Sequence, residues 1–321
     1  MIEYLIACGV LSFLTTTVLT KMLIPRLRKA GMIGKDENKG NKVEVAEMGG
    51  LGMIAGFSAG LLLAIFFNSF FGLQFNLVYI LASIITILII AIIGIADDLL
   101  SLPQWLKAVL PLFAAVPLVA VKAGTTMITI PLLGAVNFGI IYILILVPLA
   151  IAVCSNLTNM LAGFNGLEAG MGAVMFAAIS LVSLSLGSSE MSILSLSMLG
   201  ALIGFLIFNF YPAKVFPGDA GTLMIGVVLA TSVIIGNLES AGVILIVPYV
   251  IDFFIKALNR FPHTYQEVLG GKLYPKGGEV KGLVHLVMKV SGGISERSLV
   301  LFFIGVEAVF ALIVIALFMR M

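Results

Sequence analysis

Long apolar runs separated by short polar segments extend along the whole chain. Ten candidate spans lie at about 2–23, 49–68, 77–96, 105–121, 139–155, 167–186, 191–210, 220–238, 240–258 and 297–319. A helix needs about 20 apolar residues to cross a hydrocarbon core of roughly 30 Å. The pattern therefore predicts an all-α polytopic membrane protein with about ten transmembrane helices.

Two regions depart from this pattern of long apolar runs. The fourth run is short and contains Pro111 and Pro117, so we expect a kinked helix there. Residues 125–130 are mostly β-branched and are flanked by Gly124 and Gly134. This composition predicts a short external hairpin or loop.

The basic residues determine the predicted orientation. With both termini outside, all of the 18 Lys and Arg residues except Lys122 and Arg320 fall at the inner side. Cytoplasmic loops carry such an excess of positive charge. We predict an N-out, C-out domain over 1–321 with cytoplasmic loops 24–48, 97–104, 156–166, 211–219 and 259–296.

Composition narrows the class of protein further. Apolar residues make up 61% of the chain and charged residues 11%, against roughly 45–50% and 25% in soluble domains. A soluble enzyme and a disordered chain are excluded. The net charge of +2 gives no indication of a nucleic-acid partner. Cys8 and Cys154 lie in apolar runs and form neither a disulfide framework nor a zinc site.

Three glycines recur every four residues at Gly52, Gly56 and Gly60. We interpret them as a small-residue face for close helix packing. Their spacing is not that of a dinucleotide fingerprint, and the chain has no Walker A pattern.

Adjacent carboxylates end the third run at Asp97 and Asp98, and Lys107 follows at the start of the fourth. Acidic residues at a helix C-terminus oppose the helix dipole and repel each other. A lysine or a cation would neutralise them, so we expect Lys107 to face the pair.

An asparagine-rich segment follows at 156–168. Asn156 and Asn159 share one helix face, and Gly163 and Gly166 then place Asn165 on a turn. Amide groups suit a hard cation or a nucleobase edge. A turn that only caps two helices is the structural alternative.

Two further segments are candidates for phosphate chemistry. In the segment 216–221, Gly218 and Gly221 bracket Asp219 at a helix start. Asp219 is either an N-cap or a metal ligand beside a backbone that can approach phosphate. The loop 259–296 is too long for a simple connector, and Arg260 lies at its membrane edge, where a diphosphate would bind.

These loops together supply carboxylates, amides, a lysine and an arginine, but few histidines and no thiolates. Such ligands favour Mg²⁺, or Mn²⁺, over zinc. Magnesium binds through one or two protein ligands and substrate phosphates, which indicates phosphoryl chemistry on a nucleotide at the cytoplasmic face. A secondary transporter would place its ionisable groups nearer the midplane. An intramembrane aspartyl protease would not need the asparagines or Lys107.

The pair Asp97–Asp98, the loop 156–168 and the sequence Phe216-Pro-Gly-Asp219 resemble the polyprenyl-phosphate N-acetylhexosamine-1-phosphate transferases. The resemblance covers nearly the whole chain. It implies a ten-span enzyme that moves a sugar-1-phosphate from a UDP-sugar to a polyprenyl or dolichyl phosphate and releases UMP.

The finer matches resemble the archaeal and eukaryotic UDP-GlcNAc:dolichyl-phosphate enzyme. These are the segments 34–39, 162–168 and 295–297. Leu258 and Asn259 stand before Arg260 where eukaryotic members have basic residues, and Ser295 replaces a common histidine. We therefore expect GlcNAc-1-phosphate transfer in the first membrane step of lipid-linked glycan assembly. The alternative is the same chemistry with another UDP-N-acetylhexosamine.

The resemblance also implies residue roles. The expected magnesium ligands are Asn159 and Asp219. The expected catalytic residues near the phosphates are Asp97, Asp98 and Lys107. The expected substrate-binding residues are Asn165, which would read uracil, Phe216, which would pack on the base, Arg260, Asn156, Gly218 and Glu47. The expected partners are the UDP-sugar, the lipid phosphate, the bilayer and a second copy of the chain, in an archaeal cell membrane.

Overall fold

The computed structural model describes residues 2–39, 43–130, 134–261 and 266–319. Within these ranges, eight helices are long and apolar enough to cross a membrane. They are α1 (Ile2–Lys29), α2 (Gly50–Phe71), α3 (Leu77–Leu100), Tyr142–Met160, α7 (Leu167–Leu186), α8 (Ser189–Asn209), α9 (Gly218–Ile235) and α13 (Glu296–Phe318). The chain is an all-helical membrane protein, as the apolar runs predict.

The remaining two predicted spans are interrupted helices. The ninth span is the pair α10 (Glu239–Leu245) and α11 (Val247–Leu258), which are bent by 56°. Proline in the first turn of α11 separates them, because proline cannot donate the hydrogen bond that would continue α10. Counting this pair gives up to nine candidate spans among the described residues, against about ten predicted.

The fourth predicted span is the shorter apolar stretch Gln104–Ala120. It consists of α4 (Gln104–Ala114) and α5 (Val116–Ala120), and Pro117 lies in the first turn of α5. The predicted kink therefore occurs here.

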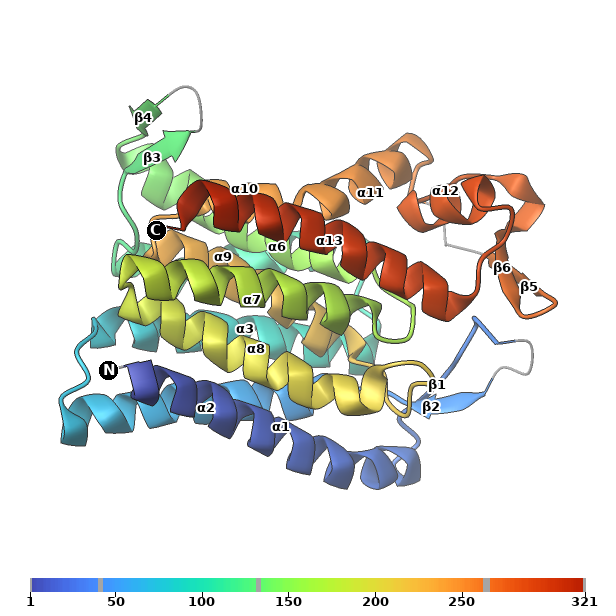
Figure 1. The fold of residues 1–321 in the computed structure, drawn as a ribbon, viewed down its shortest axis with the longest axis horizontal. Coiled ribbons are helices and arrows are strands. Elements are labelled where there is room, and N and C mark those ends of the chain that lie inside the picture. The colour runs from blue at the N-terminus through green and yellow to red at the C-terminus, as the bar shows by residue number, and fades with distance from the viewer. Residues whose placement is uncertain (1, 40–42, 131–133, 262–265, 320–321) are drawn as a thin grey trace.

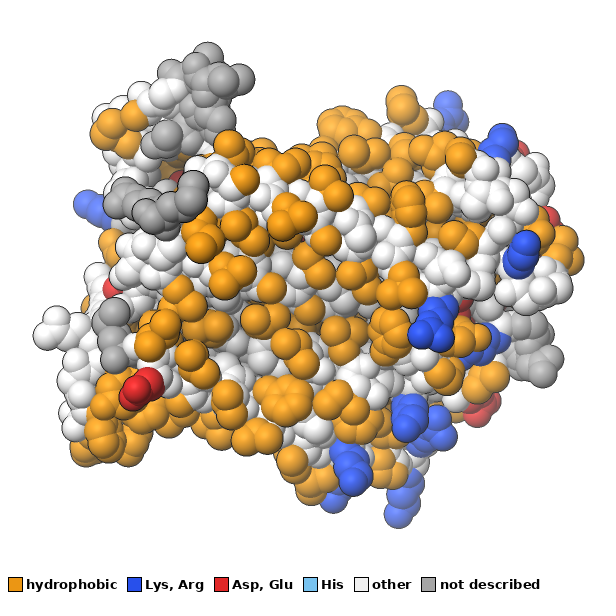
Figure 2. Space-filling model, viewed as in Figure 1, with side chains coloured by type: hydrophobic (Ala, Val, Ile, Leu, Met, Phe, Trp, Pro, Cys, Tyr) orange, Lys and Arg blue, Asp and Glu red, His pale blue; other side chains and the backbone are white. Residues whose placement is uncertain are grey.

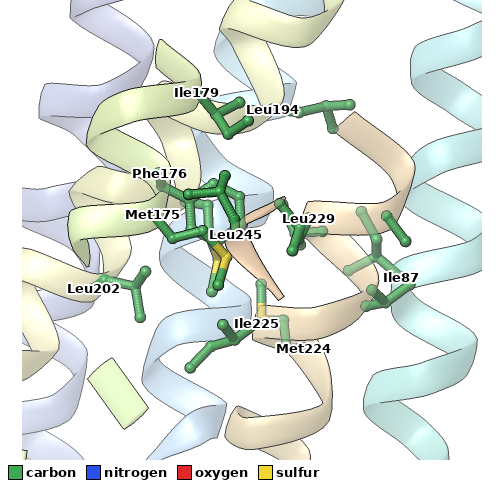
Figure 3. Packing of buried hydrophobic residues seen from close by; sticks show 14 of the residues in the cluster. Ile87, Met175, Phe176, Ile179, Leu194, Leu202, Met224, Ile225, Leu229 and Leu245 are labelled. Carbon is green, nitrogen blue, oxygen red and sulfur yellow. The ribbon is translucent and has the colours of Figure 1, made fainter. Parts of the chain in front are cut away.

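Helix α9 lies at the centre of the bundle and is almost entirely buried. It packs against α3, α8 and α6 (Val147–Met160), which continues a π-helical turn at Tyr142–Leu146. Figure 3 shows side chains of α9 meeting those of α7 and α8 in the apolar core. The elements that flank α9 therefore determine which polar groups can reach its N-terminus.

The glycine stripe on α2 packs tightly against α1. A Cβ atom at Gly56 would lie 1.9 Å from Thr16 Oγ1, and one at Gly52 would lie 2.3 Å from Thr20 Oγ1. Only glycine leaves room for these contacts. The interpretation as a helix-packing face is confirmed.

The two ends of the bundle differ in structure and charge. One end carries β1 (Ile33–Lys35), β2 (Glu44–Ala46), β5 (Gln266–Leu269), β6 (Lys272–Pro275), a 3₁₀ turn (Lys276–Gly278) and α12 (Leu283–Val290). The other end carries both termini together with β3 (Met127–Ile130) and β4 (Gly134–Asn137) (Figure 1). Most Lys and Arg side chains gather at the first end, and apolar side chains cover the flank between the ends (Figure 2). This separation matches the predicted orientation, which stays a prediction.

Three antiparallel hairpins lie at the ends of the bundle. The hairpin β3–β4, with Met127 opposite Asn137, is the one predicted; its tip, 131–133, lies outside the described residues. The hairpins β1–β2 and β5–β6 and helix α12 were not predicted. Each is too short to produce a clear hydrophobic period in the sequence.

Candidate active site

Three helix ends meet at the basic end of the bundle: the C-terminus of α3, the start of α4 and the N-terminus of α9. Lys107 Nζ of α4 lies 2.5 Å from Asp97 Oδ2 of α3 and 3.5 Å from Asp219 Oδ2 of α9. The Asp97 side chain is 2% exposed, whereas that of Asp219 is 29% exposed. Lys107 thus neutralises a buried carboxylate and reaches an accessible one.

Asp98 points to a different partner from Asp97. Its Oδ1 accepts a 2.7 Å hydrogen bond from the Asp219 backbone N–H, and its Oδ2 accepts one of 3.3 Å from Ala220. These are N–H groups that the first turn of a helix leaves unpaired, and the positive end of the α9 dipole attracts the carboxylate. Each of the adjacent acids thus has its own partner, which offsets the repulsion between them.

Two glycines allow this close approach of α3 and α9. A Cβ atom at Gly94 would lie 2.4 Å from the Ala220 Cα. Gly218 has φ +67° and lies against the Asp98 carboxylate, where an added Cβ atom would be 2.6 Å from Oδ2. A larger residue at Gly94 would move the backbone of the site itself.

The amides of α6 lie beside Asp219. Asn159 Oδ1 accepts a 2.6 Å hydrogen bond from Thr222 Oγ1 of α9. Asn156 Nδ2 donates to the Ala152 carbonyl oxygen at 2.8 Å. Asn156 and Asn159 line the same cavity as Asp219, on the shared helix face that their spacing predicts.

This cavity is an open cleft of about 980 Å³ between α4, α6 and α11. Its polar lining residues are Gln104, Lys107, Asn156, Asn159, Asp219 and Lys256. Its apolar lining residues include Leu112, Leu149, Val153, Val250, Phe253 and Phe254. The cleft therefore has a polar, charged part and apolar walls, and the walls are formed by helices that face the membrane.

The loop between α1 and α2 forms backbone hydrogen bonds with the segment that precedes α9. Ala46 of β2 forms a parallel bridge with Val215, and the Phe216 N–H donates to the Ala46 carbonyl at 2.8 Å. The carbonyl of Phe216 in turn accepts from Gly49 at 2.8 Å. These bonds fix the backbone around Phe216, whose side chain is half-buried.

Glu47 lies beside this strand and against Gly34. Although the residue is largely exposed, partial desolvation of its carboxylate raises its pKa, and the negative charge of Asp98 raises the pKa further. The structure thus brings Glu47 into the electrostatic field of the site.

Asn165 and Arg260 do not line the cleft. Asn165 is buried in the turn before α7, where it contacts Asp36 and Glu296. Arg260 is exposed in a turn after α11 with φ +58°, and its side chain makes no ion pair or hydrogen bond with the described residues. The adjacent Phe261 lines the cleft. His263, in the same loop, lies outside the described residues.

Comparison with known proteins identifies the family. A profile named glycosyl transferase family 4 matches residues 80–237. A protein of Sulfolobus acidocaldarius is 39% identical over 315 residues, which cover 95% of this chain and 94% of the relative. The chain belongs to glycosyl transferase family 4. This is the family of polyprenyl-phosphate N-acetylhexosamine-1-phosphate transferases that the motifs resemble.

Two further relatives are informative. A protein of Saccharolobus solfataricus is 38% identical over 96% of this chain and 94% of its own length. Both archaeal relatives are provisionally named UDP-N-acetylglucosamine–dolichyl-phosphate N-acetylglucosaminephosphotransferase. A phospho-N-acetylmuramoyl-pentapeptide-transferase of Halalkalibacterium halodurans is 31% identical over 76% of this chain and 78% of its own.

The ligands in the cleft of this transferase fit Mg²⁺. Asp219 and Asn159 offer hard oxygen atoms that border the same cleft. Across the ranges that the structure describes, no group of three or more Asp, Glu, His or Cys side chains is arranged to hold a metal ion. This donor set suits an ion that completes its coordination with water and substrate phosphates.

Sequence reasoning missed Lys256 as a site residue. Its Nζ lies 2.8 Å from Asp252 Oδ2, donates to the Met160 carbonyl and lines the cleft. In the sequence it is one of many basic residues on the side predicted to be cytoplasmic. Its contact with Met160 of α6 depends on how α11 packs against α6, which the sequence does not record.

Proposed function

We propose that this family 4 transferase moves N-acetylglucosamine-1-phosphate from UDP-GlcNAc to a dolichyl or other polyprenyl phosphate and releases UMP. The observation that carries the proposal is the cleft that joins Asp219, Asn159 and Lys107 to apolar walls. A phosphate attached to a long hydrocarbon chain has the same division into a charged head and an apolar body.

The choice of sugar and lipid is supported by the names of the two archaeal relatives. The relative from H. halodurans carries a different sugar in its name. Another UDP-N-acetylhexosamine is therefore the second candidate donor for this chain, with the same reaction.

The lipid acceptor fits the apolar part of the cleft. Phe253 and Phe254 of α11 and Val153 of α6 line it, and α11 ends at the basic end of the bundle. A polyprenyl chain would lie along these helices, with its phosphate towards Lys107. The reaction would then take place at the end of the bundle that carries most of the basic residues, which we assign to the cytoplasmic side.

The donor diphosphate would lie at the N-terminus of α9. Asp219 and Asn159 would hold Mg²⁺, which would offset the charge that develops on the transferred phosphate. Lys107 would add positive charge beside the same oxygen atoms. Arg260, which is exposed and precedes the cleft residue Phe261, would contact the diphosphate or sugar.

The environments of the two adjacent acids favour direct attack by the lipid phosphate. Asp97 is ion-paired with Lys107, and Asp98 accepts two backbone hydrogen bonds. Neither carboxylate is free to act as a nucleophile without breaking these contacts. The second pKa of a phosphate monoester is about 6, so a strong base is unnecessary near neutral pH. A covalent aspartyl intermediate is the alternative route.

The uracil base would be read by Asn165 and would pack on Phe216. Asn165 lies at the same end of the bundle as the cleft, in the turn that follows α6. Glu47 would contribute to substrate binding at the nearby edge of the site, where its carboxylate interacts electrostatically with that of Asp98.

The test is release of UMP by the purified protein in detergent. We expect release from UDP-GlcNAc only when both dolichyl phosphate and Mg²⁺ are present. UDP-GalNAc and UDP-MurNAc-pentapeptide serve as alternative donors. Release from one of these alone would change the sugar assignment, and no release from any donor with lipid and metal would contradict the proposed reaction.

A further inference from the structure

Three polar segments that are distant in the sequence converge on the Asn165 side chain. They are the loop after β1, the turn before α7 and the start of α13. Asp36, Asn165 and Glu296 are 2%, 1% and 4% exposed. Two carboxylates and an amide are thus buried together next to the proposed nucleotide site.

The two carboxylates fix the orientation of the Asn165 carboxamide. Its Nδ2 donates to Asp36 Oδ2 at 3.0 Å and to Glu296 Oε2 at 3.2 Å. A carboxamide nitrogen has two hydrogen atoms, and both are used here. If the group were inverted, its oxygen would face two carboxylate oxygens with no hydrogen between them.

The other end of the same carboxamide has no partner. Asn165 Oδ1 is buried and accepts no hydrogen bond from any described residue. Buried polar atoms are nearly always paired in folded proteins. Gly163 is exposed, and nothing lies within 4 Å of a Cβ atom added there, so the turn that carries Asn165 borders open space. A ring that supplies the missing donor would have to enter past this turn.

The carboxylates are themselves held in place. Glu296 Oε1 accepts from the Asn165 backbone N–H at 2.9 Å and from Asn38 Nδ2 at 3.2 Å. Asp36 pairs with Lys39 Nζ at 2.7 Å. These contacts fix the two carboxylates, and the carboxylates in turn fix the orientation of the Asn165 carboxamide.

We propose that Asp36 and Glu296 are positioning residues that present Asn165 Oδ1 as the only free hydrogen-bonding group of this side chain, so that the site selects uracil over cytosine. The inference rests on the proposed function, because it takes a uridine nucleotide to bind at Asn165. Uracil carries an N3–H that donates to the free oxygen. In cytosine, N3 is an acceptor, so a ring held in the same place by its diphosphate would bring two lone pairs together.

The test compares UMP with CMP on the full-length protein in detergent with Mg²⁺, by isothermal titration calorimetry. The wild-type protein should prefer UMP by at least about tenfold, since a mispaired buried acceptor is unfavourable. Asp36→Asn combined with Glu296→Gln replaces both carboxylates with amides that can themselves donate, which permits Asn165 to invert. The double substitution should reduce the ratio of UMP to CMP affinity about tenfold, and each single substitution, which leaves one carboxylate in place, should reduce it less.

Glu44→Gln is the matched control, because it neutralises an exposed carboxylate of β2 in the same loop. It should leave the ratio unchanged. Thermal melting establishes that each variant is folded. If Glu296→Gln does not fold, Glu296→Asp keeps the charge and withdraws the oxygen atoms by one methylene group; combined with Asp36→Asn, it should also lower the preference.

The outcomes separate this inference from the proposed function. If the wild-type protein binds neither nucleotide, the proposed uridine donor is contradicted, and if it binds both equally, the selection of uracil inferred here is overturned. If it prefers UMP and the folded variants keep that preference unchanged, the positioning role is overturned while the proposed function stands.

Discussion

The backbone N–H of Asp219 donates a 2.7 Å hydrogen bond to Asp98 Oδ1. The second of two adjacent acids thus caps the helix that carries the proposed metal ligand. Its neighbour Asp97 turns towards Lys107 instead. This division explains how two consecutive carboxylates are tolerated at a helix C-terminus, and it links α3, α4 and α9 at one point.

Asp219→Ala should reduce lipid-dependent UMP release by on the order of 10²-fold or more, because it removes a carboxylate that would hold Mg²⁺ at the diphosphate. Lys29→Ala, at an exposed position at the end of α1, is the control and should retain activity. Activity equal to that of the control would rule out the metal assignment.

Lys107→Met should destabilise the protein, because it leaves the buried Asp97 carboxylate without its cation. The cost should be about 1–3 kcal/mol, visible as a lower melting temperature in detergent. Asp97→Asn in the same chain should recover part of this loss. A double-mutant cycle measures the coupling, and additive effects would show that the ion pair contributes no stability.

Gly94→Ala should reduce activity by about 10–100-fold, because the added carbon forces α3 away from Ala220 and displaces both acids. Gly305→Ala is the matched control, since nothing lies within 4 Å of a Cβ atom at that position in α13. Initial rates of UMP release from the two purified variants make the comparison. Equal activities would mean that the close approach of α3 and α9 does not position the site.

Val153→Trp should raise the KM for dolichyl phosphate, because the larger ring fills the apolar part of the cleft. The affinity for UMP should stay unchanged. Leu144→Trp, at an exposed site on the same helix outside the cleft, is the control. A larger effect on UMP binding than on lipid KM would place the lipid elsewhere.

We expect His285 to make the segment around α12 sensitive to acid. Desolvation and the positive charges of Lys256 and Lys281 lower its pKa, while Asp252 opposes the shift. Its Nδ1 accepts from the Lys281 N–H, which requires the neutral ring. The pKa of His285 in the folded protein is below its unfolded value of about 6.5. The stability that the neutral ring contributes is therefore complete above pH 6.5 and is lost as pH falls towards the folded pKa.

The measurement for His285 is the melting temperature of the wild-type protein and of His285→Gln at pH 7.5 and pH 5.5. The melting temperature of the wild-type protein should exceed that of His285→Gln by less at pH 5.5 than at pH 7.5. A difference between the two proteins that is the same at both pH values would contradict the assignment.

Much of the architecture follows from the sequence because insertion in a membrane is a local property. The length and apolar character of each run specify a helix, and the basic residues separate the two ends of the bundle. Prolines such as Pro117 mark the interrupted helices. The family follows from short motifs, because phosphoryl chemistry needs particular side chains at particular spacings.

Only the tertiary structure decided which of those side chains meet. The sequence predicts that Lys107 faces the two acids, but only the structure shows that Lys107 pairs with Asp97 and that Asp98 accepts from the N-terminus of α9. The structure places Asn165 outside the cleft that Asn159 lines. It also enclosed Asp36 and Glu296 around Asn165, although the two acids are 260 positions apart in the chain. Such contacts depend on how helices pack and bend in three dimensions, and hydrophobic patterns record only which face of each helix is apolar.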